Sequence, residues 1–191
     1  MKTKLISPLF LVCAVSAVHS AKSMQRTNAQ SFARTDNMVN VYQAKLTPVA
    51  EKLFRGVTSR LSVADKNKAA AASSFVISKS DKNLFTFAGE EEAPFNVEVT
   101  VVDLNSDGVE EIILQWGNSF WSGYAGTSCT LLVKNVKTGN YDSNLGFPGI
   151  VEVLSTKTNG YKDLKIDLPG FEFPVYKWTG TKYELKGRVK Q

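Results

Sequence analysis

The chain has 191 residues, a formal net charge of +5 and a single histidine. The mild excess of Lys and Arg is spread along the chain, without the clustered basic and aromatic face that is typical of a nucleic-acid-binding surface. Hydrophobic residues make up 43% of the chain, which is enough to build one domain with a core.

The first 20 residues have the pattern of a secretory signal peptide. Lys2 and Lys4 give a positive start, residues 5–18 are apolar, and Val18 and Ser20 are small residues at positions −3 and −1 of a cleavage site before Ala21. The apolar stretch is too short to span a membrane. We therefore expect a periplasmic or secreted protein without a membrane span.

Removal of this segment would limit the chemistry of the mature chain. His19 and Cys13 would leave with it, so that no histidine and only Cys129 would remain. This composition excludes Ser-His-Asp triads, Cys-His dyads, and zinc sites built from histidine or several cysteines. Because the neighbours of Cys129 are apolar, we expect a buried, inert thiol; the alternative is an intermolecular disulfide or a reactive thiol.

Residues 21–40 are polar and predict a flexible leader, and residues 41–191 predict a single α+β domain. In this domain apolar residues first recur at near-helical spacing over 41–61, with Thr47 as the N-cap and Pro48 in the first turn.

A second helical piece is expected over 64–74, where a run of alanines favours helix. The apolar stripe of the first helix predicts that it packs on a sheet face.

From Phe75 onward the sequence predicts β-hairpins, with turn signals such as Asn159-Gly160 between β-rich runs. The expected strand pairs are 74–78 with 83–87, 96–102 with 111–116, 130–135 with the residues after 137–140, 151–154 with 161–166, and 174–178 with 182–185. The predicted fold class is therefore α+β. We expect an N-terminal helix that packs on one mainly antiparallel, hairpin-rich β-meander. The meander is expected to curl, and a partly barrel-like sheet is one form that it could take.

Residues 103–111 have the spacing of a cation-binding loop, with oxygen-bearing side chains at positions one, three, five and nine and glycine at six. The predicted ligands are the side chains of Asp103, Asn105, Asp107 and Glu111 and the backbone carbonyl of Val109. Four carboxylates within nine residues would repel one another without a cation, so Ca²⁺ is the predicted structural cofactor. The alternative is an Asp- and Asn-rich turn that holds no metal.

The loop is not an EF-hand, because position twelve is Leu114 and both flanks are typical of strands. The strand–loop–strand pattern resembles the calcium loops of FG-GAP and VCBS-type β-repeats, in which the ninth residue closes the site. The chain is also similar to small secreted bacterial proteins of uncharacterised function that carry one such loop. The matching pieces are Asp103–Glu111, Gly123–Thr130 and Tyr176–Tyr183. The resemblance implies a calcium-binding hairpin and leaves the activity open, and a single loop excludes a full propeller.

Residues 116–124 interleave aromatic rings with Gly, Ser and Asn, which is typical of a binding loop. The candidate partner-binding residues are Trp116, Phe120, Trp121 and Tyr124. For Trp116 and Phe120 the alternative is that they cover the open end of the sheet, whereas Trp121 and Tyr124 are expected to be exposed. The expected partner is a protein or glycan of the cell envelope.

The predicted function is an exported, calcium-stabilised, non-enzymatic binding domain that uses this aromatic segment. One alternative is a periplasmic inhibitor or immunity protein against a toxin or hydrolase. Another is a hydrolase that uses carboxylates, for which Glu152, Asp163 and Asp167 are candidates, although strand alternation predicts that they face solvent.

Overall fold

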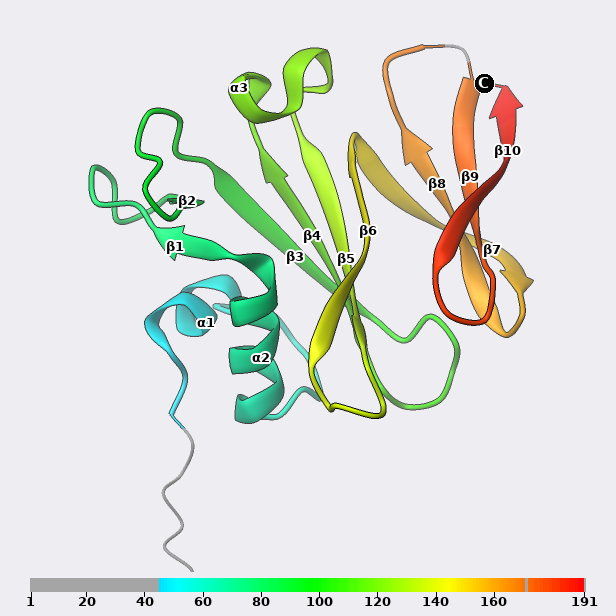
Figure 1. Ribbon diagram of the computed structural model, residues 1–191, viewed down its shortest axis with the longest axis horizontal. Helices are drawn as coiled ribbons and strands as arrows, with labels where there is room; N and C mark the ends of the chain where they lie inside the picture. Colours follow the sequence, from blue (N-terminus) through cyan, green and yellow to red (C-terminus); the bar gives the residue numbers. More distant parts are fainter. Residues whose placement is uncertain (1–44, 171, 191) are drawn as a thin grey trace, which may run out of the picture. The chain divides into compact units, whose positions relative to one another are not determined.

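The computed structural model describes residues 45–170 and 172–190. The expected signal peptide and leader, and the start of the first expected helix at Val41, lie outside these residues. Figure 1 shows short helices at the beginning of the described part, followed by hairpins that run to its end.

The predicted α+β class is wrong. The described residues form ten strands in three antiparallel sheets and are 17% helical, so the fold is mostly β. The expected single meander is divided into separate sheets, and none of them closes into a barrel in the described part. The sequence overstated the helical share because apolar spacing near the N-terminus continues after the first helix has ended.

Helix α1 (Pro48–Leu53) begins at the predicted N-cap, where the Thr47 hydroxyl accepts the backbone N–H of Ala50. Its six residues end well before Leu61, the predicted limit. Gly56 then adopts a left-handed φ of 75°, a conformation that stops a helix. The apolar residues that follow lie in a loop, although they still pack against the core.

Helix α2 (Val63–Ser73) contains the predicted second helical piece. The hydroxyl of Ser62 accepts the backbone N–H of Asp65 at 3.1 Å and caps the first turn. The helix ends where Ser74 takes a left-handed φ of 61°. Ala69 and Ala70 are buried, so small side chains let this helix lie close to the sheet beneath it.

The strands pair in the predicted hairpins. The small sheet contains β1 (Phe75–Ile77) and β2 (Phe85–Phe87). The central sheet contains β3 (Asn96–Val102), β4 (Glu111–Gly117), β5 (Ser128–Lys134) and β6 (Tyr141–Pro148), in that order. The C-terminal sheet contains β7 (Ile150–Thr158), β8 (Tyr161–Asp167), β9 (Glu172–Trp178) and β10 (Tyr183–Lys190), also side by side in chain order. A short helix α3 (Ser119–Ser122) and a 3₁₀ turn η2 (Gly123–Ala125) connect β4 to β5.

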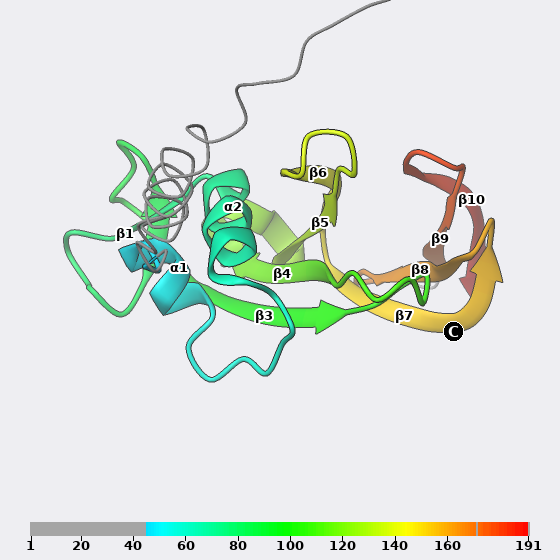
Figure 2. The same cartoon turned by 90° about the horizontal axis from the view of Figure 1, so that it is seen from below.

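The central sheet has a hydrophobic core on each of its faces. Ile112 and Leu114 of β4 pack with the helices and the small sheet, whereas Ile113 between them packs with residues of the C-terminal sheet. Figure 2 shows these layers, with the helices and β1 on one side of the central sheet and β7–β10 on the other. Because both faces are covered, β4 has a continuous apolar run in place of alternation.

Gly149 alone separates β6 from β7 and carries the chain from the central sheet to the C-terminal sheet. Its φ is 121°, and a Cβ at this position would lie 2.6 Å from the backbone oxygen of Asp167. Its N–H donates to the carbonyl of Thr127, and its own carbonyl accepts the side-chain amide of Gln115. Only glycine fits both this conformation and this space.

Candidate functional site: an acidic loop between two strands

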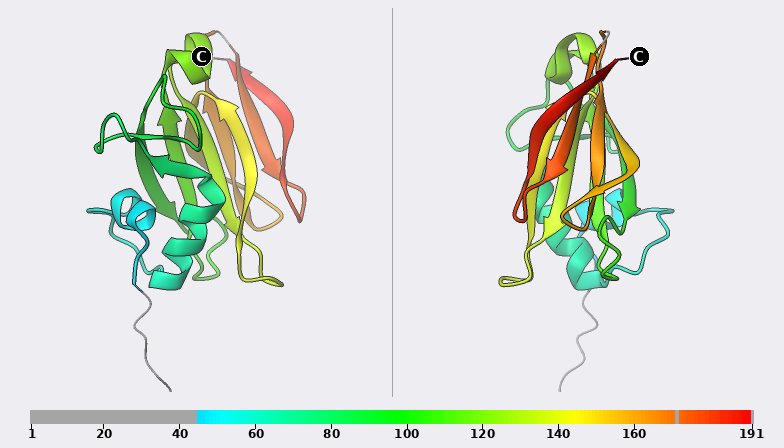
Figure 3. Two further views of the ribbon diagram at one scale, coloured as in Figure 1. Left: turned by 60° about the vertical axis from the view of Figure 1, so that its left-hand side comes forward. Right: turned by 90° about the vertical axis from the view of Figure 1, so that its right-hand side faces the viewer.

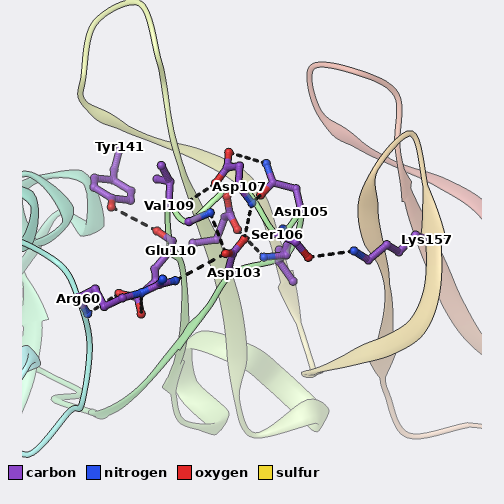
Figure 4. Close-up of polar contacts among 12 residues, drawn as sticks. Arg60, Asp103, Asn105, Ser106, Asp107, Val109, Glu110, Tyr141 and Lys157 are labelled. Carbon is purple, nitrogen blue, oxygen red and sulfur yellow. Dashed lines mark hydrogen bonds and ion pairs between the residues drawn. The ribbon is translucent and has the colours of Figure 1, made fainter.

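The candidate loop, residues 103–111, joins β3 to β4, where Val102 pairs with Glu111. Ser106 and Gly108 have φ values of 67° and 88° and turn the backbone back on itself. Figure 4 shows the side chains of this loop with their polar contacts. The loop is therefore a tight connection, held at its base by the last pair of the β3–β4 ladder.

Asp103 organises the turn through its carboxylate. The carboxylate accepts the backbone N–H groups of Ser106 at 2.7 Å, Asp107 at 3.2 Å and Gly108 at 2.9 Å. Burial acts to raise the pKa of Asp103, but these hydrogen bonds and the nearby Arg60 outweigh it, so the pKa lies below its ordinary value. Asp103 is thus held as a carboxylate by the loop itself.

Asn105 and Asp107 bond to each other inside the loop. The Asn105 side-chain amide donates to Asp107 at 2.7 Å, and the Asp107 N–H donates to the Asn105 side-chain oxygen at 3.0 Å. The other Asp107 oxygen accepts the N–H of Val109. The sequence-predicted residues at positions one, three, five and seven therefore lie in one network.

Glu111 closes the loop from the interior side and is only 2% exposed. Its carboxylate accepts the backbone N–H of Leu104 at 2.8 Å. The pKa of Glu111 is raised to about 7, mainly by burial and also by the charges of Asp107 and Asp103, against the lowering effect of that hydrogen bond. A buried carboxylate beside two others is costly to ionise.

Two basic residues contact the loop from distant parts of the chain. The Arg60 guanidinium lies 3.6 Å from Asp103 and 3.4 Å from Glu110, and the Arg60 backbone N–H donates to Glu110 at 2.7 Å. On the other side Lys157 donates to the Ser106 hydroxyl at 3.1 Å. Sequence reasoning missed both residues, because each lies about 50 positions from its partner and carries no local signal.

No group of three or more His, Cys, Asp or Glu side chains in the described residues converges as a metal cluster. The loop oxygens are instead turned towards the N–H groups of the loop. Sequence spacing therefore brings Asp103, Asn105 and Asp107 together, with Glu111 beneath them, in a hydrogen-bonded turn.

The aromatic segment 116–124 is divided between core and surface. Trp116 packs edge-on against Phe75 and Phe87, with ring centroids 5.5 and 5.3 Å apart. Trp121 packs on Phe87, and its indole N–H donates to the carbonyl of Ala93 at 2.7 Å. Both tryptophans lie against the core that the helices share with the central sheet, so the expectation that Trp121 is exposed is wrong.

The remaining two aromatic residues of the segment are exposed. Phe120 is 57% exposed and Tyr124 is 93% exposed, in α3 and η2 respectively. The Asn118 side chain caps α3 by accepting the N–H groups of Phe120 and Trp121. Only Phe120 and Tyr124 of the four candidate residues are therefore presented mainly to solvent.

The loop and the aromatic segment lie at opposite ends of β4. Both views of Figure 3 show α3 at the end of the central sheet that is remote from the β3–β4 loop. At about 3.4 Å per residue, the seven residues of β4 separate them by roughly 20 Å. An ion in the loop would therefore not directly position the exposed aromatic residues.

The carboxylates considered for hydrolysis do not form an acid–base pair. Glu152 and Asp167 both contact the ammonium of Lys165, at 2.6 and 3.2 Å. Asp163 is 1% exposed and accepts the Thr156 hydroxyl, so the expectation that it faces solvent is wrong. It is covered by side chains of the neighbouring strands, Thr156 of β7 and Lys177 of β9, the latter 3.7 Å from its carboxylate.

Cys129 is buried in β5 with 1% exposure, as predicted. Burial raises the pKa of its thiol to about 11, which leaves it protonated at neutral pH.

No helix within residues 45–170 and 172–190 has the length and apolar character needed to cross a membrane. Comparison with known proteins gives no matching family model, curated protein or solved structure.

Proposed function

We propose that residues 103–111 bind a calcium ion and that the chain is an exported, calcium-stabilised, non-enzymatic binding domain. The observation that carries the proposal is the Glu111 carboxylate, which is almost fully buried beside Asp103 and Asp107. A divalent cation among these three groups would favour their ionised forms and offset their repulsion.

The donor set fits a hard cation. Side-chain oxygens of Asp103, Asn105, Asp107 and Glu111 and the backbone carbonyl of Val109 would hold the ion, with water completing the shell. The N–H groups that Asp103 accepts do not exclude this role, because a carboxylate offers about four lone-pair directions. When bound, the ion would supply positive charge and cross-link the loop.

The proposed role of the ion is structural, because the loop is joined to the C-terminal sheet. The N–H of Lys162 donates to the carbonyl of Leu104 at 2.9 Å, and Lys157 contacts Ser106. Ordering the loop would therefore also order the β7–β8 turn against the central sheet.

Thermal and chemical unfolding in calcium and in chelator test the proposal. With ~1 mM calcium and a Kd of ~0.1 mM, typical of extracellular modules, stabilisation is roughly 1.4 kcal/mol. Asp107→Asn should lose most of this gain. Glu92→Gln, a charge-matched change in an exposed stretch, should keep it. Coincident unfolding curves in calcium and chelator would contradict the proposal.

Export is tested separately. Mass spectrometry of the protein from periplasmic and extracellular fractions should find a mature chain that begins at Ala21. Full-length chain retained in the cytoplasm would contradict this part of the proposal.

The exposure of Phe120 and Tyr124 favours the second candidate function, a periplasmic inhibitor or immunity protein. Exposed aromatic side chains are frequent anchors at protein interfaces. A pull-down from periplasmic extract should then recover one dominant toxin or hydrolase with the wild-type chain and not with the Phe120→Ala/Tyr124→Ala double variant. Equal recovery with both would reject this surface.

A further inference from the structure

A pocket of about 400 Å³ opens between the central and C-terminal sheets, near the acidic loop. It is bounded by the β5–β6 turn, the start of β8 and the β9–β10 turn. The residues that matter here are Asn135, Lys137, Asp142, Asn144, Tyr161 and Trp178. Its volume lies within the ~300–1,000 Å³ of small-ligand sites.

One wall of the pocket is a rigid aromatic stack. The rings of Tyr161 and Trp178 lie 4.2 Å apart at 22°, and Tyr183 packs edge-on against Trp178 at 5.2 Å. The Tyr183 hydroxyl donates to the carbonyl of Lys162 at 2.7 Å and fixes its ring. Trp178 is 8% exposed and Tyr183 is 4% exposed, so the ring surface open to a ligand belongs mainly to the half-buried Tyr161, which this packing holds in place.

The opposite wall carries planar polar groups and a free cation. Asp142 accepts the side-chain amide of Asn135 at 2.9 Å and retains capacity for further hydrogen bonds. Asn144 holds the β9–β10 turn by accepting the N–H of Tyr183 and donating to the carbonyl of Thr181. Lys137 forms no ion pair with any residue of the described ranges.

The acidic loop supports this pocket directly. Its Asn105 side chain lies beside the Tyr161 hydroxyl, and its Leu104 carbonyl accepts the N–H of Lys162, the next residue on β8. The aromatic segment 116–124, by contrast, lies at the far end of β4. A second pocket, lined by Gly108, Val109 and Glu110 of the loop, has a volume of only about 120 Å³. The larger pocket beside Tyr161 is therefore the candidate ligand site.

We propose that the pocket binds a saccharide. A sugar ring has C–H faces that pack on aromatic rings and hydroxyl groups that bond to amides, carboxylates and ammonium groups. The pocket offers ring surface on one side and these polar groups on the other. Of the two lysines that line the pocket in the described part of the chain, Lys134 is paired with Asp65, which leaves too little positive charge for a polyphosphate. The polar wall disfavours an acyl chain. The inference rests on the proposed binding role and not on the ion.

Amide NMR spectra of the full chain should be recorded during titration with short chito-, cello- and galacturono-oligosaccharides. The expected result is saturable shifts at residues lining the pocket with at least one of the three. Lys137→Ala should weaken that binding about tenfold, the effect of one hydrogen bond to a charged group. Lys79→Ala, an exposed lysine remote in sequence, serves as the matched control and should bind as wild type.

Trp178→Phe keeps an aromatic ring behind Tyr161 and gives a second variant, in which binding is expected to weaken. Because Trp178 is buried in the core, its unfolding midpoint should also fall, and binding is compared at a temperature at which the variant is folded. Absence of shifts with all three saccharides, shifts confined to Phe120 and Tyr124, or unchanged binding by Lys137→Ala would each overturn the proposal. The same titration in chelator separates the two proposals. Calcium-dependent melting without saccharide binding rejects only the pocket, and saccharide binding without calcium-dependent melting rejects only the ion.

Discussion

The two ends of β4 hold their polar and aromatic side chains in different ways. At the loop end, Asp103, Asp107 and Glu111 gather negative charge, with Arg60 as the contacting cation. At the other end Trp116 and Trp121 are packed, and each indole N–H has an acceptor. The loop end retains repulsion between carboxylates that a cation would relieve. At the other end, the packing and the hydrogen bonds of both tryptophans are satisfied within the fold.

This difference shows that closeness in sequence does not place the aromatic segment close to the loop in space. The aromatic segment follows β4 directly, yet a strand carries the chain away from the loop, and a residue on a different hairpin, Tyr161, lies beside it. The residues that lie beside the acidic loop are therefore determined by which turns of the two sheets lie at the same end.

The largest expected effect tests the packed end. Trp116→Ala should lower the free energy of unfolding by about 4 kcal/mol, because the ring contacts Phe75, Phe87 and Phe95 and leaves a cavity among them. Urea unfolding followed by far-UV circular dichroism measures this loss. A loss near zero would mean that Trp116 is not a core residue.

The next effect tests the loop end through pH. The pKa of Glu111 is about 7 in the folded chain and 4.5 ordinarily, so between these values the folded chain holds a proton that the unfolded chain has released. In chelator, the resulting stability is fully present below pH 4.5 and is lost as the pH rises through about 7, by about 3 kcal/mol.

Urea unfolding across this pH range, with chelator and with calcium, measures the dependence. Calcium should reduce the fall, because the ion favours the carboxylate form. Glu111→Gln removes the titrating group and should abolish the difference between low and neutral pH. An equal fall in that variant would assign the pH dependence to other groups.

A smaller effect concerns Arg60, whose guanidinium competes with a cation for Asp103. Because its side chain is 64% exposed, the ion pair contributes little, about 0.5 kcal/mol. Arg60→Ala should therefore change stability in chelator only slightly and raise calcium affinity about twofold by isothermal titration calorimetry. A loss of calcium affinity would show that Arg60 supports the site.

The smallest effect is at the exposed aromatic residue. Tyr124→Ala should change the free energy of unfolding by less than about 0.5 kcal/mol, because its side chain is 93% exposed. The same urea experiment compares it with Trp116→Ala. A large loss would mean that Tyr124 packs against part of the protein.

Local signals in the sequence were sufficient to predict which strands pair as hairpins. Asn159 and Gly160 both adopt positive φ, 49° and 87°, as a tight two-residue turn requires, and β7 and β8 pair on either side of them. The Thr47 cap was likewise predicted, because the capping group and its N–H lie within three residues.

Contacts between residues that are distant in the chain could not be predicted from local sequence signals. The step from the central sheet to the C-terminal sheet depends on Gly149, against which Asp167, distant in sequence, is packed. The burial of Trp116 depends on the small sheet, formed from residues some 30–40 positions earlier. In the candidate site, the spacing of the acidic residues predicted that they lie together, but Arg60 comes from the loop between α1 and α2, and Lys157 and the pocket come from other hairpins.

The single-residue joint at Gly149 also governs how the domain unfolds. Since β6 and β7 are edge strands of different sheets, separating the sheets would break both backbone hydrogen bonds of Gly149 and expose the core that they share. In the described residues the C-terminal sheet packs on this shared core alone, whereas the central sheet also packs against the helices. The C-terminal hairpins and the central sheet should therefore melt together in one cooperative transition, although they are built as two separate ladders.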